Sequence, residues 1–198
     1  MTRSLTVVAT GPLTTVQDAG RPGQAALAIG RSGACDRASY ELANRLVGNA
    51  PDAAALEVTF GGLLLKADDA MMVATTGARC AGSWPHNAPT TLRAGGELRL
   101  GPPSTGLRTY VAVRGGLDVA LVLGSRSTDL LAGLGPAPVS PGDVLAVGEP
   151  RFAPPDVDIA PVADPSHGDV AVRVLPGPRR DWFTDEAWAL LVGTAYAV

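Results

Sequence analysis

The sequence predicts a mainly β protein in which short antiparallel strands are joined by tight turns. Glycine and proline are abundant, at 24 and 17 of 198 residues, whereas aromatic residues make up only 5% of the chain. Several segments alternate apolar and polar residues, which is the period of a strand with one buried face. Turn residues separate these segments at short intervals, a spacing typical of an antiparallel barrel or sandwich.

The first fifty residues predict a strand, a loop and a helix. The strand covers residues 5–9 and ends at the turn pair Gly11-Pro12. Residues 14–23 are dense in polar and turn residues, so they predict an ordered loop. Asp36 is a good helix N-cap and apolar residues then recur every three to four positions, which predicts a helix over residues 36–47. Gly48 follows as the left-handed residue that commonly ends a helix.

Residues 56–114 predict a run of strands. Segments 56–60, 63–66, 71–75 and 107–114 are apolar or alternating and are bounded by turn residues. In the first segment Glu57 and Thr59 lie opposite Val58, so they are predicted to face solvent. Residues 91–93 and 98–100 flank the pair Gly95-Gly96, which predicts a hairpin.

The last fifty residues predict a connection and the start of a second domain. Five prolines lie within residues 149–168 and disfavour both helix and central strand. A strand over residues 170–175 and a helix capped by Thr184 are predicted to follow. Residues 8–12 and 174–178 share the pattern Val-x-x-Gly-Pro, which indicates either two copies of one barrel or coincidence.

The predicted organisation is therefore a first β domain at 1–148, a proline-rich connection at 149–168 and an incomplete second domain at 169–198. A barrel copy cut this short leaves apolar side chains such as Trp182, Phe183, Trp188 and Leu191 without partners. Residues 170–198 are expected to pack on the first domain, to dimerise or to be disordered.

Composition and charge exclude several classes of protein. The net charge is -3 and the basic residues are scattered, so neither a nucleic acid nor a membrane is expected as a partner. The sequence has no apolar run long enough to cross a bilayer and no signal peptide, so a cytoplasmic location is expected. Cys35 and Cys80 are far apart and are expected to be reduced, a disulfide being the less favoured alternative. Because His86 and His167 are isolated, no metal site is predicted.

Four polar loops, at 17–23, 32–36, 115–118 and 123–129, carry the candidate functional residues. Arg21 is a candidate anion ligand, or it ties down its own loop by donating to carbonyl groups. Asp36 is either a helix cap or a catalytic acid, and the N-terminus of the helix that it begins could receive a carboxylate or a developing oxyanion. Cys35 beside it is a reactive thiol or an ordinary small residue. The hydroxyl, guanidinium and carboxyl groups of residues 125–129 suit a polar substrate, or they form an elaborate turn.

Seven ordered blocks of the sequence carry a resemblance to one family. They are Gly11-Pro-Leu-Thr-Thr-Val-Gln-Asp-Ala-Gly-Arg-Pro-Gly23, Ser32-Gly-Ala-Cys-Asp36, Leu42-Ala-Asn-Arg-Leu-Val-Gly-Asn49, Leu56-Glu-Val-Thr-Phe-Gly-Gly62, Thr76-Gly-Ala78, Leu123-Gly-Ser-Arg-Ser-Thr-Asp129, and Leu175-Pro-Gly-Pro178 with Asp181-Trp-Phe183. Together they resemble the allophanate hydrolase subunit 2 family, also called the biotin-dependent carboxyltransferase family, which includes the C subunit of 5-oxoprolinase.

The resemblance implies a fold and an activity. The fold is a cyclophilin-like antiparallel β-barrel with one or two short helices, followed by an incomplete second barrel copy. The activity is that of a subunit in an ATP-dependent complex that hydrolyses an amide or lactam, either 5-oxoproline to glutamate or allophanate. The implied partners are a kinase-inhibitor-like second subunit and a third subunit, and ATP is the cofactor of the complex. Two alternatives stay open: a non-catalytic regulator of a kinase-inhibitor-like protein, and a carboxyltransferase-type domain that acts on urea.

The resemblance also selects candidate site residues, because an amide carbonyl needs donors for its developing oxyanion. The catalytic candidates are Arg126, Ser127 and Asp129. The substrate-binding candidates are Arg21, Ser32, Gly33, Asp36 and Asn44. No general base is assigned. The sequence departs from the family pattern at Cys35, where methionine is usual, at Gly135-Pro136, and at Val198, where the chain stops and family members continue with one wall of the site.

Overall fold

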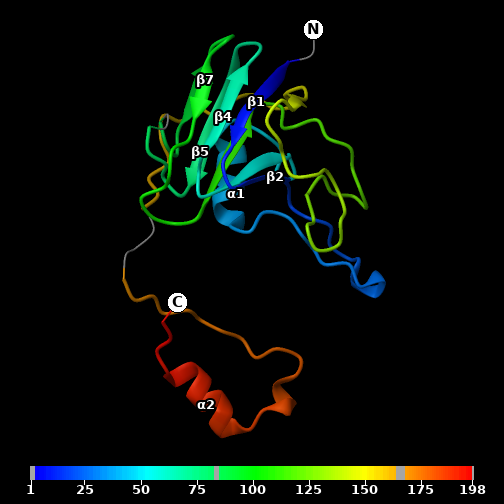
Figure 1. Ribbon diagram of the computed structural model, residues 1–198, viewed down its shortest axis with the longest axis vertical. Helices are drawn as coiled ribbons and strands as arrows, with labels where there is room; N and C mark the ends of the chain where they lie inside the picture. The colour runs from blue at the N-terminus through cyan, green and yellow to red at the C-terminus, as the bar shows by residue number, and fades with distance from the viewer. Residues whose placement is uncertain (1–2, 83–84, 164–167, 198) are drawn as a thin grey trace. The chain divides into compact units, whose positions relative to one another are not determined.

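The computed structural model describes residues 3–82, 85–163 and 168–197 (Figure 1). The chain divides into two compact units, Met1–Pro165 and Ser166–Val198. His167, which the sequence marks as isolated, lies outside the described residues. Each unit is described by itself.

The first unit is mainly β and antiparallel, as the sequence predicts. Its strands are β1 (Ser4–Thr10), β2 (Leu13–Gln17), β3 (Ala55–Thr59), β4 (Leu63–Ala67), β5 (Met71–Gly77), β6 (Pro89–Leu92), β7 (Glu97–Arg99), β8 (Arg108–Val113) and β9 (Val144–Ala146). Four strands form one sheet in the order β7-β4-β1-β9, and five form another in the order β2-β3-β8-β5-β6. The described strands therefore make two open sheets, and their ladders do not close into one barrel.

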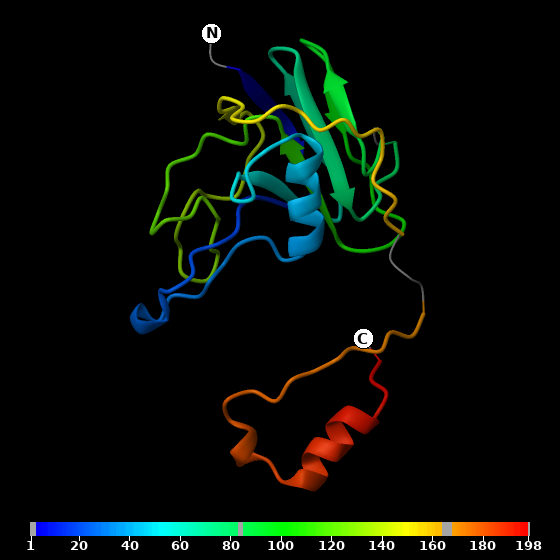
Figure 2. The same cartoon turned by 180° about the vertical axis from the view of Figure 1, so that it is seen from behind.

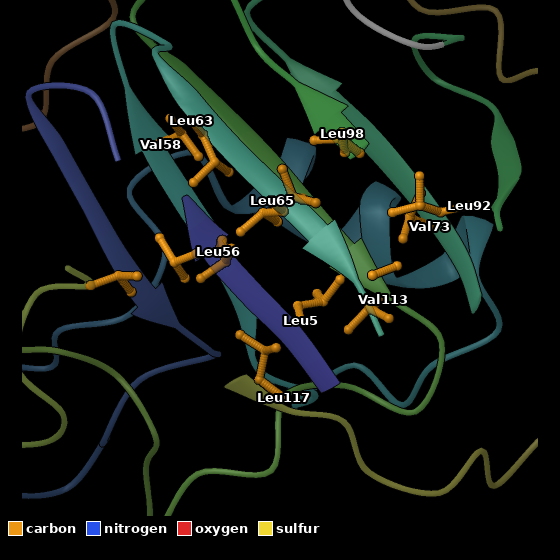
Figure 3. Packing of buried hydrophobic residues seen from close by; sticks show 14 of the residues in the cluster. Leu5, Leu56, Val58, Leu63, Leu65, Val73, Leu92, Leu98, Val113 and Leu117 are labelled. Carbon is orange, nitrogen blue, oxygen red and sulfur yellow. The ribbon is translucent and has the colours of Figure 1, made fainter. Parts of the chain in front are cut away.

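The main core lies between the two sheets (Figure 3). Leu5, Leu63 and Leu65 from the four-stranded sheet pack with Leu56 and Val113 from the five-stranded sheet, and all are at most 1% exposed. Burial of apolar side chains at about 25 cal/mol per Å² makes this layer the main source of stability.

Helix α1 (Arg37–Leu46) covers the other face of the five-stranded sheet, in front of which it is seen in Figure 2. The side chain of its N-cap, Asp36, accepts a hydrogen bond from the backbone N–H of Ser39, and Gly48 follows the helix with φ 66°. Both predicted helix ends are confirmed. Tyr40 and Ala43 of α1 pack against Tyr110 of β8, so β3, β8 and β5 are covered on both faces.

Two predictions about the strands of the first unit are wrong. Residues 14–23 are not all loop, because β2 occupies Leu13–Gln17 and pairs with β3, where the β-branched residues Thr14 and Thr15 suit a strand. Residues 91–100 do not form a hairpin, because β6 pairs with β5 in one sheet and β7 pairs with β4 in the other. The turn at Gly95-Gly96 passes between the sheets. The short strand β9 was not predicted.

Part of the predicted proline-rich connection packs within the first unit. Val157 and Ala160 contact the apolar cluster under α1, and the N–H of Ala160 donates to the carbonyl of Asn87 at 2.7 Å. The guanidinium of Arg114 donates to the carbonyl of Phe152. The limits proposed for the domains stay predictions.

The second unit contains the short helix η2 (Arg180–Trp182) and α2 (Asp185–Gly193). The predicted cap is confirmed, since the Thr184 hydroxyl accepts from the N–H of Ala187 at 3.2 Å. The predicted strand over residues 170–175 is wrong: this segment has no regular structure, because the described part of the unit offers no neighbouring strand to pair with. Trp182, Phe183 and Leu191 are 69%, 59% and 51% exposed. Among the described residues, no helix combines the length and the apolar character needed to cross a membrane.

Candidate functional site

Three loops of the first unit meet in a polar cluster that is buried except at its edge, where Ser32 and Asp129 are half-buried. This cluster, here called the three-loop network, consists of Asp18, Arg21, Ser32, Ser125, Ser127 and Asp129. The loops that contain Arg21 and Ser32 lie back to back, because the N–H of Arg21 donates to the carbonyl of Arg31 at 2.7 Å. Gly33, at φ 89°, is needed for this approach: a Cβ there would lie 2.8 Å from the backbone nitrogen of Gly20.

Asp18 is the centre of the network. Its carboxylate accepts from the hydroxyls of Ser125 and Ser127, both at 2.6 Å, and from the N–H of Arg126 at 2.5 Å. The carboxylate also accepts from the N–H of Gly20 at 2.8 Å. Asp18 is only 4% exposed. A carboxylate that accepts this many hydrogen bonds fixes the backbone of residues 125–127 relative to the loop that contains Arg21.

Arg21 and Asp129 form the side of the network in which the donors of the arginine all bond within the protein. The Arg21 guanidinium donates to the Ser127 carbonyl at 2.6 Å and to the Ser32 hydroxyl at 3.0 Å, and it lies 3.5 Å from the Asp129 carboxylate. Ser32 in turn donates to Asp129 at 2.6 Å. This hydrogen bond from Ser32, with backbone donors and Arg21, lowers the pKa of Asp129. The Arg21 side chain is 0% exposed, so no ligand can reach it from solvent. All its observed partners belong to the protein, and its role is therefore to tie the loops together.

Beside this network lies the first cavity, with a volume of about 300 Å³, and Arg126 lines it. The remaining walls come from residues 49–54, 115–118 and 148–151. The Nε of Arg126 donates to the Val119 carbonyl at 2.8 Å, and its two terminal nitrogens make no hydrogen bond within the described part of the chain. Arg126 is thus fixed at its backbone by Asp18 and at Nε by Val119, which leaves the end of the guanidinium available to a ligand.

Asn44 supports the wall of the first cavity. It is fully buried, its Nδ2 donates to the Ala53 carbonyl at 3.0 Å, and its Oδ1 accepts from Asn49 at 2.9 Å. The Oδ1 of Asn49 then accepts from the N–H of Gly115 at 2.8 Å. Asn44 therefore shapes the wall formed by residues 49–54 and 115–118, and it does not itself line the cavity.

A second cavity, of about 450 Å³, lies at the amino end of α1. Arg108, Asp36 and Asn87 are among the polar residues that line it, and Leu42 and Ala78 are among the apolar ones. Here the Asp36 side chain caps the helix by accepting from the N–H and hydroxyl of Ser39, which is the structural alternative that the sequence left open. Cys35 is exposed at this cavity and Cys80 is buried, and the two cysteines are not joined by a disulfide.

Glu57 lies directly beneath the second cavity, and the prediction that it faces solvent is wrong. It is 4% exposed because α1 covers the face of β3 on which it lies. Its carboxylate accepts from Arg108, from the Tyr110 hydroxyl at 2.7 Å and from the N–H of Cys35 at 2.8 Å. Burial, together with the hydrogen bond to Glu57, raises the pKa of Tyr110, so the phenol stays a donor.

The structure therefore separates the predicted site residues into three places. Arg21, Ser32, Ser127 and Asp129 meet in the three-loop network, with Gly33 in its backbone. Arg126 projects from that network into the first cavity, Asn44 supports the wall of that cavity without lining it, and Asp36 lies at the second. Sequence reasoning missed Asp18, Glu57, Arg108 and Asn87. Only Asp18 had a signal, since it lies in the same polar loop as Arg21, between turn residues. Within the described residues no group of three or more possible metal ligands occurs.

Comparisons with known proteins agree on one family. The family model described as "Carboxyltransferase domain, subdomain A and B" matches residues 27–198. The chain is 38% identical over 182 residues to the C subunit of 5-oxoprolinase from Escherichia coli K12, covering 88% of this chain and 58% of that protein. It is 33% identical over 203 residues to urea amidolyase of Lachancea kluyveri, covering 91% of this chain and 11% of that protein. The chain thus spans little more than half the length of the bacterial relative and a small part of the fungal one.

The chain is also similar to solved structures. The crystal structure of TTHA0988 matches with a TM-score of 0.84 at 35% identity, covering 98% of this chain and 39% of that one. The crystal structure of Kluyveromyces lactis urea amidolyase matches with a TM-score of 0.68 at 34% identity, covering 76% of this chain and 10% of that one.

Proposed function

The chain belongs to the family of the carboxyltransferase domain, subdomain A and B, and from this membership we propose that it is part of an enzyme subunit that acts on an amide-like carbonyl group. The substrate class is a small amide, lactam or urea, since the relatives are a 5-oxoprolinase component and urea amidolyase. Both bacterial relatives, from Escherichia coli and Haemophilus influenzae, are single subunits of 5-oxoprolinase, which supports work within a complex of several subunits.

The observation that carries this proposal is that Arg126 lines the first cavity with the end of its guanidinium available. Chemistry at an amide carbonyl places negative charge on the carbonyl oxygen, and a fixed donor aimed at that oxygen lowers the barrier. Arg126 is such a donor, because Asp18 holds its backbone at 2.5 Å and Val119 holds its Nε at 2.8 Å. Ser127 and Asp129 contribute by position: their side chains bond to Asp18, Ser32 and Arg21 and keep the loop in place.

The finer assignment is lactam hydrolysis driven by ATP in a cytoplasmic complex. In this assignment a kinase-inhibitor-like subunit and a third subunit join the chain, and together they convert 5-oxoproline to glutamate. ATP use is attributed to the complex and not to a site on this chain. Allophanate is the alternative amide substrate. The similarity to urea amidolyase favours a second candidate, a carboxyltransferase-type domain that acts on urea.

Reconstitution tests the proposal. The chain is mixed with its inhibitor-like and third subunits, and ATP hydrolysis is measured with 5-oxoproline, allophanate or urea as the added substrate. We expect 5-oxoproline to stimulate ATP hydrolysis only when this chain is present. Arg126→Ala is expected to lower the stimulated rate about 100-fold, the usual effect of removing one oxyanion donor.

Arg99→Ala is the matched control, because the Arg99 side chain is 66% exposed and lies on β7. Its rate should equal that of the unchanged chain. Stimulation by urea with biotin-dependent carboxyl transfer would instead favour the urea candidate. Full activity in the Arg126→Ala variant would refute the assignment of Arg126, and complex formation without any turnover would favour a non-catalytic regulator of the inhibitor-like protein.

A further inference from the structure

We infer that the second cavity binds a small aliphatic carboxylic acid, with its carboxylate on Arg108 and its hydrocarbon chain on the apolar wall of the cavity. The inference is independent of the proposed function, because the ligand has no amide group and its site has none of the residues of the first cavity. Three features carry it: a fixed arginine with unused donors, a balance of charge that suits one anionic group, and a wall of apolar side chains.

Arg108 provides the cation, and a buried neighbour fixes its position. One of its terminal nitrogens donates to Glu57 and, at 3.3 Å, to the Thr59 hydroxyl. Its Nε and its other terminal nitrogen make no hydrogen bond among the described residues, and the side chain is 28% exposed where it lines the cavity. These two nitrogens form one edge of the planar guanidinium, which is the geometry that binds a carboxylate through two parallel hydrogen bonds.

The charges around the cavity suit a single carboxylate. Glu57 accepts from three donors, only one of which is Arg108, so it does not need the remaining edge of the guanidinium. The carboxylate of Asp36 also lines the cavity, and it accepts from the N–H and the hydroxyl of Ser39. With one arginine and a second carboxylate nearby, the described lining repels a phosphate or a dicarboxylate more strongly than a single carboxylate.

The apolar side chains that line the cavity determine the body of the ligand. They are Ala38, Leu42, Ala78, Leu107, Val162 and Ala163. The cavity volume of about 450 Å³ is in the range of sites that bind small molecules, which are mostly apolar with a few placed polar groups. Because burial of hydrocarbon favours binding in proportion to the area removed from water, an aliphatic chain is the body that this wall favours.

Direct binding to this chain alone, without ATP or partner subunits, tests the inference. The probe is hexanoate, titrated by calorimetry, with acetate, butanoate and 1-hexanol as comparison ligands. The alcohol has the chain without the carboxylate and should bind at least tenfold more weakly than hexanoate. From acetate to hexanoate the affinity should rise about fourfold for each added methylene group, as expected for burial of hydrocarbon. An affinity that stays constant along this series, or equal binding of 1-hexanol, would overturn the inference.

Ala38→Glu is the decisive variant, because Arg108→Ala would also leave Glu57 without its cation and lower the stability of the fold. Ala38 is exposed in the first turn of α1, where an acidic side chain favours the helix, and it lines the cavity. The added carboxylate competes for Arg108 and is expected to weaken hexanoate binding at least tenfold. Arg99→Ala makes the same change in net charge on β7 and should leave binding unchanged. Equal affinities of Ala38→Glu and the unchanged chain would contradict the inference.

Two further measurements need no variant. In the NMR spectrum of the unchanged chain, the Nε–H signal of Arg108 should shift when hexanoate is added. An equal concentration of 5-oxoproline should not displace hexanoate, because the polar lactam would lie against the apolar wall. No shift of the Arg108 signal, or displacement by 5-oxoproline, would overturn the inference. Loss of turnover in the reconstituted complex, with hexanoate still bound, counts against the proposed function alone.

Discussion

Two carboxylates of the first unit, with side chains at most 9% exposed, each hold an arginine, and the two pairs differ in how many donors the arginine has left over. In the pair Arg21–Asp129 the arginine side chain is 0% exposed, and in the pair Arg108–Glu57 it is 28% exposed. Arg21 donates to Ser127 and Ser32 as well as approaching Asp129. Arg108 donates with one nitrogen to Glu57 and Thr59 and lines the second cavity with the rest.

An arginine paired with a carboxylate is therefore informative about function only when its remaining donors are known. Both arginines lie near turn or strand ends, and both have a carboxylate partner. The donors of Arg21 bond to two other loops, at Ser32 and at residues 122–127, so it stabilises the fold. Those of Arg108 bond to one strand, so the same chemical group is left available at a cavity.

The largest expected effect is the loss of stability caused by Arg21→Ala. Removing this side chain leaves the buried Ser127 carbonyl and the Asp129 carboxylate without their cation, and breaking a buried ion pair typically costs about 3–5 kcal/mol. Arg108→Ala removes a more exposed partner and should cost about 1–2 kcal/mol. The measurement is urea unfolding of both variants beside the unchanged chain. Equal losses in the two variants would remove the distinction between the pairs.

An intermediate effect is expected for Glu57→Gln. The neutral amide keeps the shape of the side chain but turns an NH₂ group toward donors, either Arg108 or the Tyr110 hydroxyl and the N–H of Cys35. The free energy of unfolding should fall by about 1–3 kcal/mol. Glu41→Gln is the control, since Glu41 is 48% exposed in a surface pair with Arg37 and should change stability by less than about 0.5 kcal/mol. A loss no larger than that of the control would mean that Glu57 is solvated after all.

Glu57 also shows why part of the site could not be predicted from sequence. The alternation Leu56-Glu57-Val58 correctly predicts a strand, and Leu56 and Val58 do face the core between the sheets. The same alternation assigns Glu57 to solvent, because it contains no information about the helix that covers that face. Its partners Arg108 and Tyr110 come from β8, which is paired with β3 but lies about fifty residues away in sequence.

Local signals predicted best where the cause is local. The Asp36 cap and the Thr184 cap were predicted because a cap bonds to the next turn of its own helix. The supposed hairpin at residues 91–100 failed because the glycine pair permits a sharp turn but does not determine which sheet each arm joins. Asn87 gave no sequence signal, since its unpaired oxygen and its positive φ follow from contacts with Thr75 and Ala160.

The smallest expected effect is on the pH dependence of stability, and it concerns the Arg21–Asp129 pair. Ser32, backbone donors and Arg21 lower the pKa of Asp129 in the folded protein. In the unfolded chain this carboxyl has an ordinary pKa of about 3.9, so in that range the unfolded state binds more protons than the folded one. The stabilisation from Asp129 is therefore complete above the unfolded pKa and is lost as the pH falls through the lower folded value. In Asp129→Asn this contribution is absent at every pH.

The measurement is the free energy of unfolding of the unchanged chain and of Asp129→Asn between pH 7 and pH 3. The difference between the two proteins should be constant from neutral pH down to about pH 5 and should then shrink toward pH 3. A difference that stays the same down to pH 3 would mean that the folded protein does not favour the ionised form of Asp129. In that case the network would be held by hydrogen bonds alone, and the contrast with the Arg108 pair would be one of exposure and not of charge.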